Sequence, residues 1–182
     1  PAIETGALFG TVSKVLDDVR LNGDEALRRY ELEFDHVSLE KLNVEDGEFY
    51  EAVNYIPEDL KKAIDVAYSN IHKFHSAQRF EEIKVETSPG VTCIQRSVPI
   101  SKVGLYIPGG TAPLFSTVLM LAIPAKIAGC SEIVLCSPPD RNGKINPYIL
   151  YAARIAGVTN VYKVGGAQAV AAMAYGTESV PK

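Results

Sequence analysis

Two pairs of glycines stand where a strand is expected to end and a helix to begin. The first lies in YIPGGT, residues 106–111, and the second in VGGAQ, residues 164–168. Paired glycines let the backbone approach a ligand closely, and the N-terminus of the following helix offers unpaired N–H groups and a partial positive charge. Each segment therefore fits a phosphate or pyrophosphate, although a tight turn between two buried elements needs the same residues.

Polar side chains beside these breaks suggest what a ligand would meet. Tyr106 ends the first strand, where its ring can stack or its hydroxyl can donate, and Gln168 carries an amide that can donate to and accept from a ribose or a carboxamide. Thr111, Ser116 and Thr117 can contact phosphate or cap the following helix. The structural alternatives are a half-buried strand tyrosine for Tyr106 and a helix-terminal residue that bonds its own backbone for Gln168.

The histidines do not form a recognisable metal or catalytic site. His72 and His75 are three residues apart on an expected helix and can share a metal, but no third ligand lies nearby, and His36 falls in an unassigned loop. No Cys–His nucleophile pair is evident either. We therefore assign no catalytic residue and no metal ligand in this chain.

The chain has three cysteines, which is an odd number without metal-ligand spacing. We interpret Cys93, Cys130 and Cys136 as reduced core residues of a cytoplasmic protein, with Cys93 in the core of a hairpin. The net charge is −4 and there is no basic run, which argues against a nucleic-acid partner. No apolar stretch reaches the roughly 20 residues of a membrane span, and no signal peptide is visible.

The second half of the chain must position the two breaks. Strands are predicted at 102–107, 132–136 and 160–164, and helices at 114–128, 146–156 and 167–175, with Gly129 and Gly157 ending the first two helices. Continuously apolar strands with crossover helices indicate a parallel sheet covered on both faces. Such sheets bind ligands at the carboxyl ends of their strands, where both breaks lie.

The first half reads as helices and a β-hairpin. Helices are predicted at 8–21 and 24–34, separated by Asn22-Gly23, and a long amphipathic helix at 60–74 after Pro57. Residues 35–55 receive no assignment. Strands at 83–87 and 91–98 flank the turn Ser88-Pro89-Gly90.

The predicted fold class is α/β, with N-terminal helices and a β-hairpin followed by an incomplete Rossmann-like βαβαβα parallel-sheet unit. We expect two parts: residues 1–102 contain the helices and the hairpin, and residues 103–182 form the nucleotide-binding unit, which is expected to continue beyond the end of the chain.

Several strings resemble the histidinol dehydrogenase family. The resemblance is carried by KVGLYIPGGTAPLFSTVLMLAIPAKIAGCSEIVLCSPP, ILYAARIAGV and VGGAQAVAAMAYGTESVPK, and by VLDDVRLNGDEALRRYELEFD and AIDVAYSNIHKFHSAQ nearer the start. It covers nearly all of residues 97–182 and much of the remainder. One departure is DRNGKINPY, residues 140–148, which is a few residues long for the family pattern and is expected to be a surface loop of little consequence.

The resemblance implies a zinc-dependent, cytoplasmic homodimer that oxidises L-histidinol through L-histidinal to L-histidine in histidine biosynthesis, reducing two NAD. It also implies Rossmann-like halves without the usual glycine fingerprint, and NAD contacts at Tyr106 and Gln168. In the family, the zinc ligands, the histidinol contacts and a catalytic Glu–His pair lie beyond the position that matches Lys182. The resemblance therefore implies an N-terminal portion that is inactive alone.

Alternatives to an enzyme fragment remain open at this point. The same strings suit a non-catalytic NAD- or nucleotide-binding module, or a folding or dimerisation module that binds nothing alone. A relative of the aldehyde dehydrogenases is a further possibility, because that fold is related, and it would need a nucleophilic cysteine elsewhere.

Overall fold

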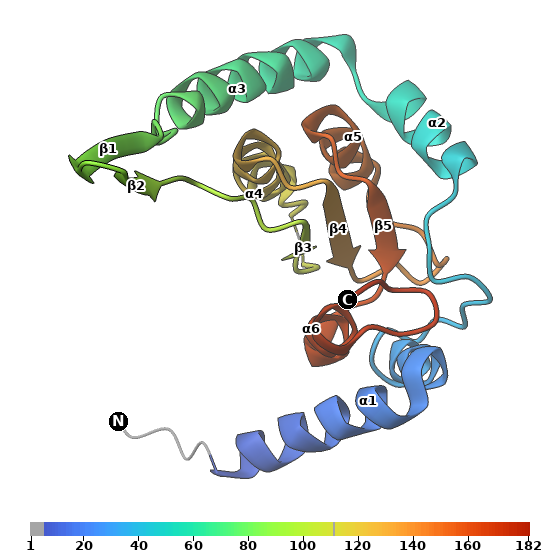
Figure 1. The fold of residues 1–182 in the computed structure, drawn as a ribbon. Coiled ribbons are helices and arrows are strands. Elements are labelled where there is room, and N and C mark those ends of the chain that lie inside the picture. Colours follow the sequence, from blue (N-terminus) through green and yellow to red (C-terminus); the bar gives the residue numbers. More distant parts are fainter. Residues whose placement is uncertain (1–5, 111) are drawn as a thin grey trace.

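A three-stranded parallel sheet lies at the centre of the computed structural model, which describes residues 6–110 and 112–182 (Figure 1). The elements in chain order are α1 (Gly6–Phe34), α2 (Asp46–Tyr55), α3 (Glu58–Ser76), β1 (Ile83–Ser88), β2 (Val91–Gln95), β3 (Lys102–Tyr106), α4 (Phe115–Ala128), β4 (Glu132–Ser137), α5 (Pro147–Ala156), β5 (Asn160–Lys163) and α6 (Gly166–Tyr175). The sheet has the order β3-β4-β5, and both pairs are parallel. The predicted β-α-β-α-β-α succession and the α/β fold class are confirmed.

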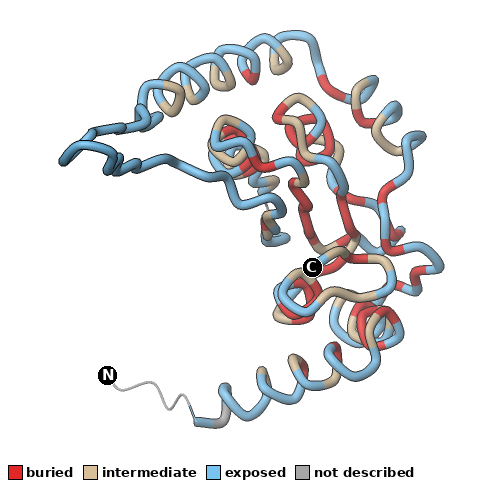
Figure 2. Tube along the Cα trace, in the orientation of Figure 1, coloured by how far each residue is buried: buried red, intermediate tan, exposed pale blue. Residues whose placement is uncertain are grey.

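Helices cover both faces of the sheet, as predicted. Figure 1 shows α4 and α5 on one side, with α3 and α2 outside them, and α6 and α1 on the other side. The side chains of β4 alternate between two cores: Leu135 packs with α4 and α5, whereas Val134 and Cys136 pack with α6 and α1. β4 is therefore buried on both faces, which explains its uninterrupted apolar sequence (Figure 2).

The helix ends follow the predicted chemistry. Gly129 and Gly157 stand at the C-termini of α4 and α5 with φ of 92° and 81°, in the left-handed region that glycine tolerates. Asn146 precedes α5, and its side chain accepts a hydrogen bond from the Tyr148 N–H at 3.0 Å. Thr111 lies outside the described residues, and neither Ser116 nor Thr117 caps α4, because the N-cap position is Leu114 and has no side-chain cap.

α1 is two helices joined by a kink, at the position where the sequence predicts a break. Gly23 has φ 49° and ψ −130°, outside helical geometry. The Glu178 carboxylate lies against it, accepting from the Asp24 N–H at 2.8 Å, and Asp24 accepts from the Thr177 hydroxyl at 2.7 Å. The kink thereby ties the segment after α6 to α1.

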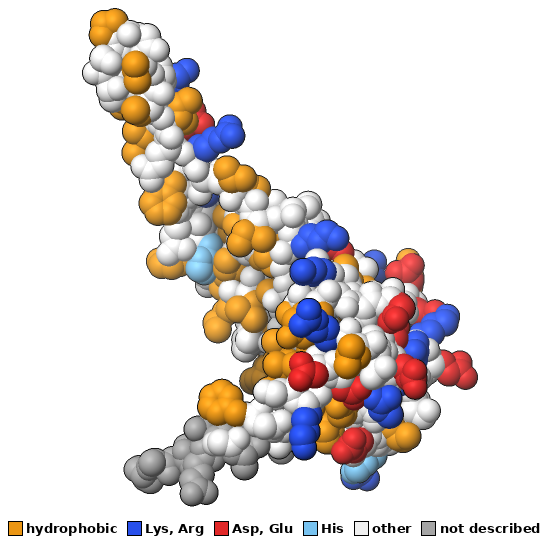
Figure 3. All heavy atoms as spheres, turned by 60° about the horizontal axis from the view of Figure 1, so that its bottom comes forward, with side chains coloured by type: hydrophobic (Ala, Val, Ile, Leu, Met, Phe, Trp, Pro, Cys, Tyr) orange, Lys and Arg blue, Asp and Glu red, His pale blue; other side chains and the backbone are white. Residues whose placement is uncertain are grey.

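The hairpin forms as predicted but is not buried. β1 and β2 pair antiparallel, and Gly90 takes φ 79° in the turn. β2 ends at Gln95 rather than Val98, and every residue of both strands is exposed. The prediction that Cys93 lies in a hairpin core is wrong, because within the described residues the hairpin packs chiefly on itself. Figure 3 shows hydrophobic side chains along this projecting arm.

Candidate functional site

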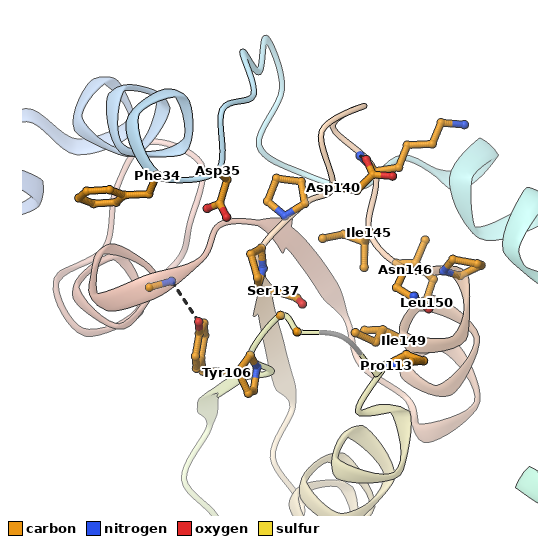
Figure 4. Close-up of a pocket in the computed structure, with 18 of the residues that line it drawn as sticks. Phe34, Asp35, Tyr106, Pro113, Ser137, Asp140, Ile145, Asn146, Ile149 and Leu150 are labelled. Carbon is orange, nitrogen blue, oxygen red and sulfur yellow. Dashed lines mark hydrogen bonds between the residues drawn. The ribbon is translucent and has the colours of Figure 1, made fainter.

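A pocket of about 950 Å³ lies at the carboxyl ends of the parallel strands. Both glycine breaks line it, together with the end of α1, the loop after β4 and the start of α5 (Figure 4). Its volume is at the upper end of the range of about 300–1,000 Å³ typical of ligand and cofactor sites. The sheet topology thus brings together two segments that are about sixty residues apart in sequence.

The first break follows β3 and leaves a helix terminus open. Tyr106 ends the strand, and the Ile107 N–H continues the sheet by donating to the Cys136 carbonyl at 2.9 Å. A Cβ on Gly109 would lie 2.6 Å from Cγ of Pro138, so the backbone here passes too close to the neighbouring loop for a side chain. The first turn of α4 has neither an acidic residue nor a side-chain cap at Leu114, and the Thr117 N–H donates to the Leu114 carbonyl at 3.0 Å. The partial positive charge of this helix terminus suits an anion.

At the second break, side chains already occupy the glycine N–H groups. The Gly165 N–H donates to Oε1 of Glu31 at 3.0 Å, and the Gly166 N–H donates to the Tyr106 hydroxyl at 3.0 Å. Gly166 takes φ 55°, and α6 begins there. The expectation that either break fits a phosphate is therefore corrected for the second one, because its glycine N–H groups are engaged.

Tyr106 and Gln168 are the two predicted cofactor-binding residues, and both line the pocket. Tyr106 is half-buried, and burial is the main cause that raises the pKa of its hydroxyl above 10.0. The side chain of Gln168 is only 2% exposed, and its Nε2 donates to Oε1 of Glu31 at 3.2 Å. The structure thus brings the two residues into the wall of one pocket, where Tyr106 contacts Gly166 and Gln168 contacts Glu31.

Glu31 does not line the pocket itself but bonds Gly165 and Gln168, and it is the residue that sequence reasoning missed. Its side chain is fully buried, and its Oε2 has no hydrogen-bond partner among the described residues. Burial raises its pKa from 4.5 to about 7, and the nearby Asp35 carboxylate adds to the rise, although the hydrogen bonds from Gly165 and Gln168 oppose it. Asp35 lines the pocket at the end of α1 (Figure 4), so this end of the pocket carries acidic groups.

The loop after β4 contributes the opposite wall. Asp140, Lys144 and Ile145 line the pocket, and Ile145 is only 3% exposed. Oδ1 of Asp140 accepts from the N–H groups of Asn142 and Lys144, both at 2.9 Å, which folds the loop back on itself. The expectation of a surface loop of little consequence is corrected, because residues of this loop line the pocket.

The histidines and cysteines do not line the pocket. His72 is exposed and His75 is partly buried on α3, where Nδ1 of His75 lies 2.7 Å from Oε1 of Gln78, and His36 is exposed after α1. Within residues 6–110 and 112–182, no group of three or more His, Cys, Asp or Glu side chains is placed to hold a metal ion. Cys130 and Cys136 are buried as predicted, and burial raises the pKa of Cys136 to about 12.

The sequence and the fold are similar to known proteins along the whole chain. A family model described as histidinol dehydrogenase matches residues 2–182. The histidinol dehydrogenase of Bacteroides fragilis is 62% identical over 182 residues, which is 100% of this chain and 42% of that protein. The histidinol dehydrogenase of Escherichia coli K12 is 53% identical over 183 residues, covering 100% of this chain and 41% of that protein.

The same likeness holds in three dimensions. The crystal structure of histidinol dehydrogenase from Elizabethkingia anophelis aligns with a TM-score of 0.95 at 46% identity, covering 100% of this chain and 42% of that one. The chain thus spans about 42% of the length of the relatives it matches. In the described part of the chain, no helix has the length and apolar character to cross a membrane.

Proposed function

The chain belongs to the histidinol dehydrogenase family, and on that premise we propose that it forms one wall of an NAD site, with Tyr106 and Gln168 as cofactor contacts. The observation that carries the proposal is the meeting of both glycine breaks at one pocket, joined by the Tyr106–Gly166 hydrogen bond. This is the edge at which open α/β sheets bind nucleotides.

The residues around the pocket fit a dinucleotide. The first break supplies a close backbone approach at Gly109 and the open N-terminus of α4, which suit the pyrophosphate. Beside the second break lie the Tyr106 ring, from the end of β3, and the Gln168 amide, which suit an uncharged part of the cofactor such as a ribose hydroxyl or a carboxamide. Bound NAD would supply the hydride acceptor, and the residues of this chain bind and orient it.

The reaction that we propose for a protein of the relatives' length is the oxidation of L-histidinol through L-histidinal to L-histidine in histidine biosynthesis. Two hydrides pass to two NAD, and one water supplies the second carboxylate oxygen. We place the zinc ligands of this proposed enzyme outside the chain, as the resemblance to the family implies. We also propose that this protein is a cytoplasmic homodimer, that its substrate is L-histidinol, and that it has no nucleic-acid or membrane partner.

We further propose that the chain is organised in two parts, 1–102 and 103–182. The second part contains nearly all of the sheet with its crossover helices, which supports the nucleotide-binding role. The first part supplies helices to both faces, since α1 packs on α6 and α2 packs on α5. The boundary therefore separates roles along the chain rather than two independently packed bodies.

A turnover assay on two lengths of protein tests the proposal. We expect histidinol-dependent NADH formation from a protein of the relatives' full length supplied with zinc, and its loss on chelation of the metal. We expect no NADH formation from the 182-residue chain alone, although NAD still binds to it. Turnover by the 182-residue chain, or none by the longer zinc-loaded protein, would contradict the assignment.

A further inference from the structure

We propose that Glu31 is a positioning residue that fixes the amide of Gln168 with its nitrogen inward and its oxygen toward the bound nucleotide. Oε1 of Glu31 accepts from Nε2 of Gln168 at 3.2 Å and from the Gly165 N–H at 3.0 Å. One carboxylate oxygen thus holds both the backbone of the second glycine break and the side chain that follows it. This inference rests on the proposed NAD site.

The chemistry of the two groups determines which way the amide faces. Oε1 of Glu31 already accepts from the Gly165 N–H, so it acts as an acceptor whether the carboxyl is ionised or carries a proton on Oε2. It therefore selects the NH₂ end of the neighbouring amide and rejects the carbonyl end. Glu31 is fully buried and Gln168 is 2% exposed, so little water competes for the contact between the two side chains. The amide of Gln168 therefore has one favoured orientation.

The amide oxygen consequently lies over Gly166. A Cβ on Gly166 would be 2.5 Å from Oε1 of Gln168, and both residues line the pocket. The oxygen occupies the space that the missing side chain leaves beside the ligand. Gln168 thus offers a hydrogen-bond acceptor to the pocket, and its ligand partner must be a donor.

This requirement selects the part of the nucleotide that the second break receives. A ribose hydroxyl or a carboxamide NH₂ can donate to Oε1 of Gln168, whereas a phosphate oxygen cannot. The carboxylates of Glu31 and Asp35 lie at the same end, and they disfavour an anion further. The pyrophosphate then belongs at the first break, where the start of α4 carries no acidic residue.

A double-mutant cycle on the affinity for NAD tests whether Glu31 acts through Gln168. Glu31→Met removes the acceptor at similar length, and we expect it to weaken NAD binding about tenfold. In a Gln168→Ala background the same change should weaken binding no further. Glu31→Gln keeps an acceptor oxygen and should retain most of the affinity, and Glu33→Met, on the exposed side of α1, is the matched control.

Hydrogen exchange of the Gln168 side-chain amide gives a readout that does not depend on NAD. The amide protons should exchange slowly in the parent chain and in Glu31→Gln, and rapidly in Glu31→Met. Additive effects in the cycle, or equal exchange in all three proteins, would overturn the positioning role. The two proposals can fail separately. If the parent chain does not bind NAD but Glu31 still protects the Gln168 side-chain amide from exchange, the proposed NAD site is wrong and the Glu31–Gln168 contact is supported.

Discussion

The Tyr106 hydroxyl accepts a hydrogen bond from the Gly166 N–H at 3.0 Å, which joins residues 60 positions apart in sequence. Tyr106 ends β3 and Gly166 begins α6 just after β5, so the contact spans the carboxyl edge of the sheet across β4. It occupies one of the N–H groups that a helix terminus would otherwise offer to a ligand. The two glycine breaks, alike in sequence, are therefore different in chemistry.

Removing the Tyr106 hydroxyl tests this bridge. Tyr106→Phe keeps the ring but leaves the Gly166 N–H without its partner, and we expect a loss of about 1 kcal/mol in the free energy of unfolding. NAD affinity should fall several-fold, because the turn that carries Gln168 loses its tie to β3. Urea unfolding and NAD titration measure the two effects, and Tyr106→Phe with parental values in both would show that the hydrogen bond has no role.

A methyl group on Gly166 should damage binding more than folding. Gly166→Ala places Cβ 2.5 Å from Oε1 of Gln168 at φ 55°, which costs about 1 kcal/mol of backbone strain and displaces the amide oxygen. We expect NAD to bind about tenfold more weakly. Gly10→Ala is the matched control, because nothing lies within 4 Å of its Cβ and alanine is the better helix former in α1. Equal NAD affinity in both variants would contradict the placement of Gln168.

The tie between the α1 kink and the segment after α6 should be a large contribution to stability. Asp24 is 5% exposed and accepts from the Thr177 hydroxyl at 2.7 Å and the Ser179 N–H at 3.1 Å. We expect Asp24→Ala to lower the free energy of unfolding by about 2 to 4 kcal/mol, because buried donors lose their acceptor. Asp17→Ala, at an exposed position of the same helix, should change it by less than about 0.5 kcal/mol. Similar losses in the two variants, measured by urea unfolding, would refute this.

Glu31 should make the chain less stable as the pH rises. Burial, with Asp35 beside it, raises its pKa from 4.5 in the unfolded chain to about 7 in the folded one, so the folded state binds the proton more tightly. The contribution of Glu31 to the free energy of unfolding is therefore fully present below pH 4.5. It is lost as the pH rises through about 7, and the loss amounts to at most about 3 kcal/mol. Glu31→Gln should flatten this part of the curve of unfolding free energy against pH. The raised pKa of Glu31 would be excluded if the unfolding free energy of the parent chain rises between pH 4.5 and 7 and Glu31→Gln gives the same curve.

The three thiols should react at very different rates. Cys93 is exposed on the hairpin, whereas Cys130 and Cys136 are buried, and the pKa of Cys136 is raised to about 12 by burial and by the charge of Glu31. A disulfide reagent should therefore modify one thiol quickly in the folded chain and all three in urea. Mass spectrometry identifies the modified residue, and rapid modification of Cys136 in the folded chain would contradict the described core.

Local sequence signals predicted the elements whose boundaries depend on local chemistry. Gly129 and Gly157 end helices because a left-handed residue is needed there, and Asn146 caps α5 with its own side chain. The sequence alone does not predict α2, because only Ala52 is buried in this ten-residue helix and its apolar face is weak. Its start is instead defined by the reciprocal cap between Glu45 and Glu48.

Features that depend on tertiary packing could not be predicted in this way. Glu31 lies in a charged stretch that is typical of a solvent-exposed helix face, and it is buried only because α1 packs on α6. Cys93 lies in a short strand with Val91 and Ile94, a composition that favours burial, but the described residues supply no element that covers the hairpin. The likeness of the two glycine breaks was likewise misleading, because the groups that occupy the second one come from α1 and β3.

The central proposal is that this chain forms one wall of an NAD site. Its most direct test is a ligand-observed NMR titration of NAD with the chain, repeated on Gln168→Ala and on Tyr106→Phe. The account predicts saturation transfer to NAD from the parent chain, strongly reduced transfer from Gln168→Ala, and reduced transfer from Tyr106→Phe. No transfer from a folded parent chain, or equal transfer from Gln168→Ala, would contradict it.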